Sequence, residues 1–225
     1  MNIILVHGAS ADGSSWSRVI PTLLSAGHNV TAAQLPLTSL SNDVKRVREL
    51  LDNLTGPTLL VGHSYGCAVV TGAGTDAKQV VGVVFIAGFA LDEGESLADV
   101  YSKYPPLESG KYVNPDVHDY LWMKPEYFPK YFAADVDLKT AKTMAVVQNP
   151  IAAQGFAEKS GPPAWKKLPS WYQISNNDKM IPPAAERMMA KRANSTTIEL
   201  NSSHASLVSH WKEVANFILL ASKSC

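Results

Sequence analysis

Residues 58–66 read Thr58-Leu59-Leu60-Val61-Gly62-His63-Ser64-Tyr65-Gly66, and the rest of the chain is best understood from this stretch. The residues before Gly62 predict a short buried strand, and a helix is expected from Tyr65 to about Gly74. Ser64 lies between these elements, with a glycine two residues before it and another two residues after it. This is the pattern of a sharp strand-to-helix turn that lifts a serine hydroxyl above the end of a sheet.

Glycine at both flanking positions has a physical reason. In so tight a turn the strand and the helix pass so close that side chains at Gly62 and Gly66 would clash, and the serine itself takes a strained backbone conformation. The first N–H groups of the helix then point toward the serine, where a developing oxyanion would sit. The pentapeptide alone also fits an ordinary turn with a solvent-facing serine, so the remaining chain has to decide.

Length and composition indicate one ordinary globular domain. A chain of 225 residues with 46% hydrophobic and 18% charged residues is long enough to bury a large core. Twenty basic and twenty acidic residues give a formal net charge of zero, and no block of like charge stands out. The composition therefore gives no indication of binding to nucleic acid or to an anionic membrane surface.

The cysteines and the hydropathy indicate the cellular location that is expected for the protein. The two cysteines, Cys67 and Cys225, favour neither a disulfide framework nor a metal site. The first apolar run, 3–6, is too short for a secretory leader, and no 18-residue apolar stretch could span a membrane. A cytoplasmic location without membrane association is the expectation.

Strands and helices are predicted to alternate along most of the chain. The apolar runs predict six strands, at residues 2–7, 29–35, 58–61, 80–87, 170–175 and 196–200. Apolar stripes at helical spacing predict the intervening helices, at 16–26, 41–54, 65–74, 184–193 and 205–220. Such alternation predicts a parallel sheet with helices on both faces, and chemistry gathered beyond the carboxyl ends of the strands.

One segment, at about 90–169, interrupts this alternation. No clear strand is apparent there, while prolines and nine aromatic residues gather between Tyr101 and Phe132. Eighty residues inserted into a regular β–α series predict a helical cap and not one long loop. The aromatics are expected mainly to form the core of this cap, with a few of them lining an apolar pocket.

Three residues with complementary chemistry follow three of the predicted strands. Ser64 follows the strand at 58–61, Asp178 the strand at 170–175, and His204 the strand at 196–200. Serine, acid and histidine in this chain order are typical of a catalytic triad on a parallel α/β sheet. Taken singly, Asp178 also suits a local turn and His204 the start of a helix, and the coincidence of all three carries the prediction.

The roles follow from the chemistry of each group. His204 would accept the proton of the Ser64 hydroxyl, which is a poor nucleophile at neutral pH, and Asp178 would orient the imidazole. The backbone N–H groups of Ala9 and Tyr65 would form an oxyanion hole. His7 and His63 flank this site but have no evident partner, so both are interpreted as structural, and His210 as a surface or cap-facing residue.

At these residues the sequence resembles the α/β-hydrolase superfamily over its whole length. Val6-His7-Gly8-Ala9, Trp16 and the turn 178–183 resemble most the small esterases related to plant methylesterases and hydroxynitrile lyases. The resemblance implies the hydrolase strand order without its first two antiparallel strands, and a cap over the active site.

The same resemblance allows a lyase chemistry. Hydroxynitrile lyases of this branch use a lysine after the catalytic histidine and a threonine after the histidine of the first strand. These positions hold Ala205 and Gly8 here, so the charge that would stabilise cyanide is missing and ester hydrolysis is favoured. Cys67 replaces a glycine often found beyond the turn, with only a packing effect expected.

The sequence therefore predicts a serine esterase for small, apolar esters, working through an acyl-enzyme without metal or cofactor. The alternatives are a hydroxynitrile lyase, a lactonase or a carbon–carbon hydrolase with the same triad, or a non-catalytic small-molecule receptor. The expected partner is a small-molecule ester. A homodimer is compatible with the sequence, which does not fix the oligomeric state.

Overall fold

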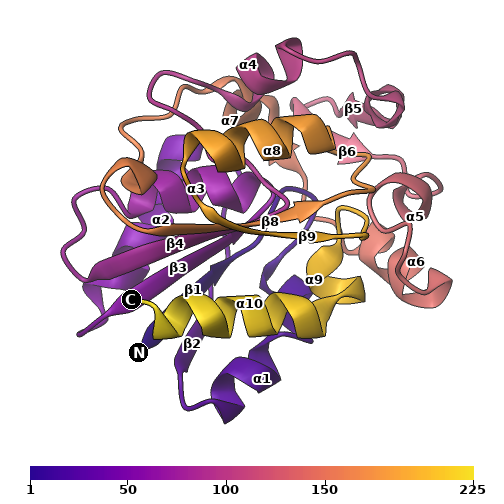
Figure 1. The fold of residues 1–225 in the computed structure, drawn as a ribbon. Coiled ribbons are helices and arrows are strands. Elements are labelled where there is room, and N and C mark those ends of the chain that lie inside the picture. Colours follow the sequence, from indigo (N-terminus) through magenta and orange to yellow (C-terminus); the bar gives the residue numbers. More distant parts are fainter.

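A six-stranded sheet forms the centre of the protein (Figure 1). The computed structural model describes residues 1–225, the whole sequence. Every pairing in this sheet is parallel, and the strand order is β2-β1-β3-β4-β8-β9. The strands are β1 (Asn2–Val6), β2 (Asn29–Ala32), β3 (Thr58–His63), β4 (Val80–Ile86), β8 (Ser170–Ser175) and β9 (Thr196–Leu200).

The predicted second strand is three residues too long. It was expected to reach Leu35, but β2 ends at Ala32. The chain leaves the sheet there, and the Leu35 amide donates a 3.0 Å hydrogen bond to Nε2 of His7 instead of to a strand. The side chain of His7, in the loop after β1, thus takes the place of a strand partner, which no local pattern could reveal.

Helices cover both faces of the sheet, as the alternation predicted. The helices α2 and α3 pack with α8 on one face, while α1 and α10 lie on the other (Figure 1). Successive residues of the inner strands point to opposite faces, so that Ile4 belongs to one core and Leu5 to the other. These helices are α1 (Ile20–Ser25), α2 (Leu40–Asp52), α3 (Tyr65–Ala73), α8 (Pro183–Arg192) and α10 (Trp211–Lys223).

Both terminal helical predictions need correction at their start. The first was placed at 16–26, but Trp16 ends a 3-10 helix, Gly13–Trp16, and α1 begins only at Ile20, next to Pro21. The last was placed at 205–220, but it is divided into α9 (Ser206–Ser209) and α10 by His210, whose backbone leaves the helical region.

The inserted segment between β4 and β8 folds over the carboxyl end of the sheet (Figure 1). The prediction that it contains no strand was wrong, because it includes a three-stranded antiparallel sheet of β5 (Val113–Pro115), β6 (Tyr120–Met123) and β7 (Ile151–Ala152). These strands have only two to four residues, too few for an alternating pattern to be recognised. Its helices are α4 (Leu97–Ser102), α5 (Phe128–Tyr131), α6 (Leu138–Val146) and α7 (Ala153–Ala157), with 3-10 turns at Glu108–Tyr112 and Ala164–Lys166.

The strand order places the loops after β1 and β3 where the sheet changes its winding direction. The chain proceeds from β1 outward to β2 and then returns past β1 to β3, so β1 and β3 are neighbours whose following loops diverge to opposite sides. Ligand sites of parallel α/β sheets form at such a switch point. Ala9 follows β1 and Ser64 follows β3, so both lie there.

No helix of the protein combines the length and the apolar character that crossing a membrane would require.

Candidate active site

Ser64 occupies the sharp turn between β3 and α3. Its backbone has φ 54° and ψ −124°, a conformation that costs a non-glycine residue about 1–3 kcal/mol. A Cβ atom at Gly62 would lie 2.5 Å from the carbonyl oxygen of Gly66, and one at Gly66 would lie 2.5 Å from that of His7. Neither position can therefore hold a side chain. The close approach of β3 and α3 explains Gly62, as predicted, whereas Gly66 is required by the backbone at the end of β1.

The structure brings Ser64, His204 and Asp178 together, although they come from three different loops. Nε2 of His204 lies 2.8 Å from the Ser64 hydroxyl oxygen, and Nδ1 lies 2.5 Å from Oδ2 of Asp178. All three side chains are buried. An imidazole held in this way can accept a proton from the serine while the carboxylate keeps the other ring nitrogen protonated.

The carboxylate of Asp178 is itself fixed by its own turn. Its second oxygen, Oδ1, accepts hydrogen bonds from the amides of Met180 at 2.6 Å and Ile181 at 2.8 Å. The local turn chemistry that was the rival interpretation of Asp178 is therefore present as well. It leaves Oδ2 directed at His204, so the two interpretations are compatible.

Ala9 and Tyr65 lie beside the serine, where their amides could bind an oxyanion. Both residues line the same cavity as Ser64 and His204. A Cβ atom at Gly8 would lie 2.7 Å from Cβ of Ser64, so the loop after β1 approaches the serine closely. The amide of Ser10 donates to the Asn149 carbonyl at 2.9 Å, which ties this loop to the inserted segment.

Tyr65 also has a buried partner that the sequence did not indicate. Its hydroxyl donates a 2.6 Å hydrogen bond to Oδ2 of Asp43 on α2, and Oδ1 of Asp43 accepts from the Leu37 amide at 2.9 Å. Asp43 has no exposed surface, and burial raises the pKa of its carboxyl to about 6. This pair fastens the first residue of α3, whose amide is one of the two candidate oxyanion donors.

The two histidines beside the site have structural partners, in line with their structural interpretation. Nδ1 of His7 donates to the Gly8 carbonyl at 2.8 Å, leaving Nε2 to accept from Leu35. Nε2 of His63 donates to the backbone carbonyl of His204 at 2.9 Å. Burial lowers the pKa of both rings, so both are neutral at pH 7. His63 thereby holds the backbone of His204 in place.

His210 and Cys67 are also as expected. Half-buried His210 has its Nδ1 3.4 Å from Oδ2 of Asp135 in the inserted segment. Cys67 is fully buried in α3, and its thiol donates to the Gly62 carbonyl at 3.1 Å. Its contribution is packing and one hydrogen bond within the turn.

An apolar cavity of about 390 Å³ opens above Ser64. Twelve of its eighteen lining residues are hydrophobic, and none is an aspartate, glutamate, lysine or arginine. Of the nine aromatics predicted for the cap, Tyr101 and Phe132 line it. Others pack on one another, as do Tyr112 and Tyr127 with ring centroids 3.7 Å apart. A few of the aromatics thus line the pocket, as expected. The three that are buried belong to a core shared with the main sheet and not to a separate core of the cap; they are Phe128, Tyr131 and Phe132.

Several lining residues were not singled out from the sequence. Phe89 follows β4, and Phe156 lies in α7 with its ring 6.0 Å from that of Tyr101. Nothing in their local sequence distinguishes them from core residues. Only the path of the inserted segment brings them over Ser64.

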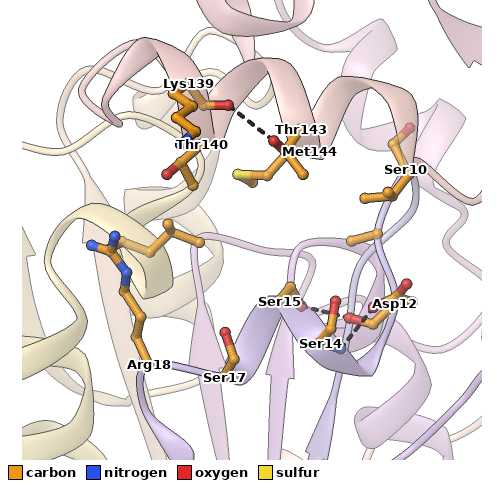
Figure 2. Close-up of a pocket in the computed structure, with 13 residues that line it drawn as sticks. Ser10, Asp12, Ser14, Ser15, Ser17, Arg18, Lys139, Thr140, Thr143 and Met144 are labelled. Carbon is orange, nitrogen blue, oxygen red and sulfur yellow. Dashed lines mark hydrogen bonds between the residues drawn. The ribbon is translucent and has the colours of Figure 1, made fainter.

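A second cavity, of about 420 Å³, also reaches Ser10 (Figure 2). Figure 2 shows serine side chains of the 3-10 helix region on one side and residues of α6, such as Thr140 and Met144, on the other. Asp12 is its one acidic residue, and its carboxylate caps the Ser14 amide at 2.7 Å. No residue of the Ser64–His204–Asp178 arrangement lines this cavity, so it has no reactive group comparable with theirs.

The structure brings together no group of three or more His, Cys, Asp or Glu side chains that could hold a metal ion.

Comparison with known proteins identifies the family of the chain. The sequence profile of the alpha/beta hydrolase family matches residues 3–217. The chain belongs to this family. Among curated relatives, salicylic acid-binding protein 2 of Nicotiana tabacum is 30% identical over 120 residues, 46% of this chain and 45% of that protein. Putative methylesterase 19 of Arabidopsis thaliana is 27% identical over 218 residues, 84% of each chain.

A solved hydrolase structure extends the comparison to the whole fold. The pyrethroid hydrolase of Sphingobium faniae JZ-2 superposes with a TM-score of 0.82 at 20% identity, covering 97% of this chain and 96% of that one. By contrast, the match to salicylic acid-binding protein 2 spans less than half the length of that relative. These findings confirm the α/β-hydrolase fold and the expected relationship to plant methylesterases.

Proposed function

We propose that this hydrolase cleaves carboxylic esters of small, apolar substrates through Ser64, His204 and Asp178. The observation that carries the proposal is the unbroken hydrogen-bonded line from Asp178 through His204 to Ser64 at the floor of an apolar cavity. Relatives named as methylesterases and a pyrethroid hydrolase support ester cleavage as the reaction class.

The mechanism has two halves. His204 accepts the hydroxyl proton as Oγ of Ser64 attacks the ester carbonyl carbon, and the resulting oxyanion accepts hydrogen bonds from the amides of Ala9 and Tyr65. The tetrahedral adduct collapses, the ester C–O bond breaks, and His204 returns the proton to the leaving alkoxide. Water then attacks the acyl-serine with the same assistance, releasing the acid and regenerating Ser64. Each oxyanion donor is worth about 3 kcal/mol in such reactions.

The cavity restricts the substrate. Its volume of about 390 Å³ suits a small molecule, and its wall offers no charged side chain to pair with a carboxylate or an ammonium group. A neutral ester with an aliphatic or aromatic acyl group fits this lining best, because a charged group there would lose its hydration without compensation.

The lyase alternative has no support at the two positions that would carry it. Ala205, directly after His204, is fully buried, and its amide donates to the Phe132 carbonyl at 3.1 Å. Gly8 lies against Ser64 too closely for a side chain. The charge and the hydroxyl that a cyanohydrin lyase of this branch would use are thus both missing.

A comparison of wild type with Ser64→Ala on p-nitrophenyl acetate and butyrate tests the proposal. Nitrophenol release should fall by about a thousandfold or more in the variant, while its thermal unfolding midpoint stays close to that of wild type. Full turnover in Ser64→Ala would contradict the triad. Release of benzaldehyde from mandelonitrile without esterase activity would favour a lyase instead, and saturable ligand binding without turnover would favour a receptor.

A further inference from the structure

A second carboxyl group is buried directly behind the candidate triad. Glu186 lies in α8 with no exposed surface, and its Oε2 accepts a 2.9 Å hydrogen bond from the amide of Ser175. Its other oxygen, Oε1, is shielded from water and has no donor facing it. A buried acceptor left in this way costs about 1–3 kcal/mol, so the arrangement calls for a proton on Glu186.

Asp178 supplies the matching acceptor. Its Oδ1 already accepts two amides and its Oδ2 accepts from His204, which leaves one lone pair of Oδ2 free. The Asp178 amide donates to the Ser175 carbonyl at 3.2 Å, and the Ser175 amide donates to Glu186, so the two carboxyl groups are held by the same residue and interact with each other. A protonated Glu186 can therefore donate to Asp178 while its carbonyl oxygen keeps the bond from Ser175. If both carboxyl groups were ionised, their charges would repel each other.

The surroundings favour the neutral acid. Burial and the charge of Asp178 raise the pKa of Glu186 well above its ordinary value. The cation that acts on Glu186 is Arg187, whose exposed guanidinium is already paired with Glu199 at 2.8 Å. The other titratable groups that interact with Glu186 are uncharged at neutral pH; they are Cys67 of α3, Tyr101 of α4 and Tyr172 of β8.

We propose that Glu186 is a neutral positioning residue whose carboxylic acid donates a hydrogen bond to Asp178 and so steadies the carboxylate that orients His204. This inference rests on the proposed hydrolase mechanism. Glu186 keeps its proton throughout the reaction, and no bond to substrate forms at it. Its effect reaches the serine through Asp178 and His204.

The decisive variant is Glu186→Gln. A glutamine can donate from its amide nitrogen to Asp178 and accept from Ser175 with its oxygen, so it reproduces the protonated acid in shape and charge. We expect kcat/KM on p-nitrophenyl butyrate to stay within about twofold of wild type, with the acidic limb of its pH profile unmoved. If Glu186 were ionised in wild type, the substitution would remove a negative charge near His204, and that limb would move to lower pH, which would overturn the proposal.

Glu186→Ala removes the hydrogen bonds of this side chain to Ser175 and to Asp178. The value of kcat should fall about tenfold, as expected when the one hydrogen bond that steadies Asp178 is lost. If Glu186→Gln keeps the wild-type kcat and Glu186→Ala does not, the hydrogen bond to Asp178 is what matters, and an ionised carboxylate at residue 186 is not required. Exposed Glu213, exchanged for glutamine, is the matched control and should change neither rate nor profile.

An infrared measurement tests the proton independently of activity. The difference spectrum of wild type minus Glu186→Gln at pH 7 should contain the C=O stretch of one protonated carboxylic acid, which the control exchange at Glu213 leaves in place. Absence of that band would overturn the proposal even if the protein is an active esterase. Presence of the band in a protein without esterase activity would instead count against the proposed function alone.

Discussion

The phenolic hydroxyl of Tyr65 donates a 2.6 Å hydrogen bond to the buried carboxyl of Asp43, which joins the residue after the candidate nucleophile to the neighbouring helix α2. The carboxyl is poorly solvated there, and burial raises its pKa from 3.8 to about 6. Stability and pH are therefore linked at this pair.

The first prediction concerns that linkage. The pKa of Asp43 is higher in the folded protein than in the unfolded chain. The protonated carboxyl therefore adds its full share to the free energy of unfolding below about pH 4, and this share is lost as the pH rises through about 6. A shift of about two units corresponds to roughly 3 kcal/mol. Asp43→Asn should therefore gain stability relative to wild type between pH 4 and pH 6.5, as measured by urea unfolding at each pH. A difference between the two proteins that does not vary with pH would contradict the prediction.

The tyrosine side of the pair gives a second prediction. Tyr65→Phe removes the donor and leaves Oδ2 of Asp43 buried without a partner, which should destabilise the protein by about 1–3 kcal/mol. Urea unfolding at pH 7 measures this loss. Tyr104→Phe is the control, because the exposed Tyr104 hydroxyl makes only a 3.4 Å contact with the Ala184 carbonyl. It should lower the free energy of unfolding by less than about 0.5 kcal/mol.

The third prediction tests the backbone of the turn. Gly62→Ala would place a Cβ atom 2.5 Å from the Gly66 carbonyl oxygen and 2.6 Å from the Cys67 amide, neither of which can move as a side chain would. We expect a loss of about 2–3 kcal/mol of stability and a large loss of esterase activity, because Ser64 would be displaced. Gly161→Ala meets nothing within 4 Å and should be silent in both assays.

The fourth prediction separates the orienting role of Asp178 from its turn. In Asp178→Asn the amide oxygen can still accept from Met180 and Ile181, but the amide nitrogen then faces Nδ1 of His204 and favours the wrong tautomer. The value of kcat should fall by about 10²–10⁴ while the unfolding midpoint moves little. An unchanged kcat would exclude Asp178 as the orienting acid.

The fifth prediction concerns acyl selectivity. Phe156 lines the cavity and is only half-buried, so Phe156→Ala should widen the cavity without unfolding the protein. The ratio of kcat/KM for p-nitrophenyl octanoate to that for the butyrate should rise about tenfold. Trp122→Ala, which alters an exposed ring outside the cavity, should leave the ratio unchanged.

The sequence was sufficient to predict the parallel sheet and the meeting of Ser64, Asp178 and His204, for one physical reason. Long apolar runs identify buried strands, and the carboxyl ends of parallel strands lie at one edge, so residues that follow different strands come together. The contacts of Asp43 with Tyr65 and of Glu186 with Ser175 could not be predicted. Asp43 and Glu186 are each one acidic residue on an amphipathic helix, where an exposed position is the ordinary expectation.

The inserted segment was the least predictable part. Its three strands have two to four residues, one of them ending at Pro115, and they pair only because the chain folds back on itself. Which residues line the cavity depends on the path of the inserted segment over the sheet and not on the secondary-structure preference of each residue. Phe89 and Phe156 are therefore found only in the folded protein.

The burial of Cys67 has a practical consequence. A thiol reacts through its thiolate, and burial raises the pKa of Cys67, so this group is both inaccessible and protonated. The other cysteine, Cys225, is exposed at the opposite end of the final helix from the His204 loop; partial burial raises the pKa of its thiol as well, but a reagent can reach it. A maleimide dye or a surface linker would therefore attach at a single known point, and it would leave the mouth of the Ser64 cavity clear for fluorescence or immobilised-enzyme measurements.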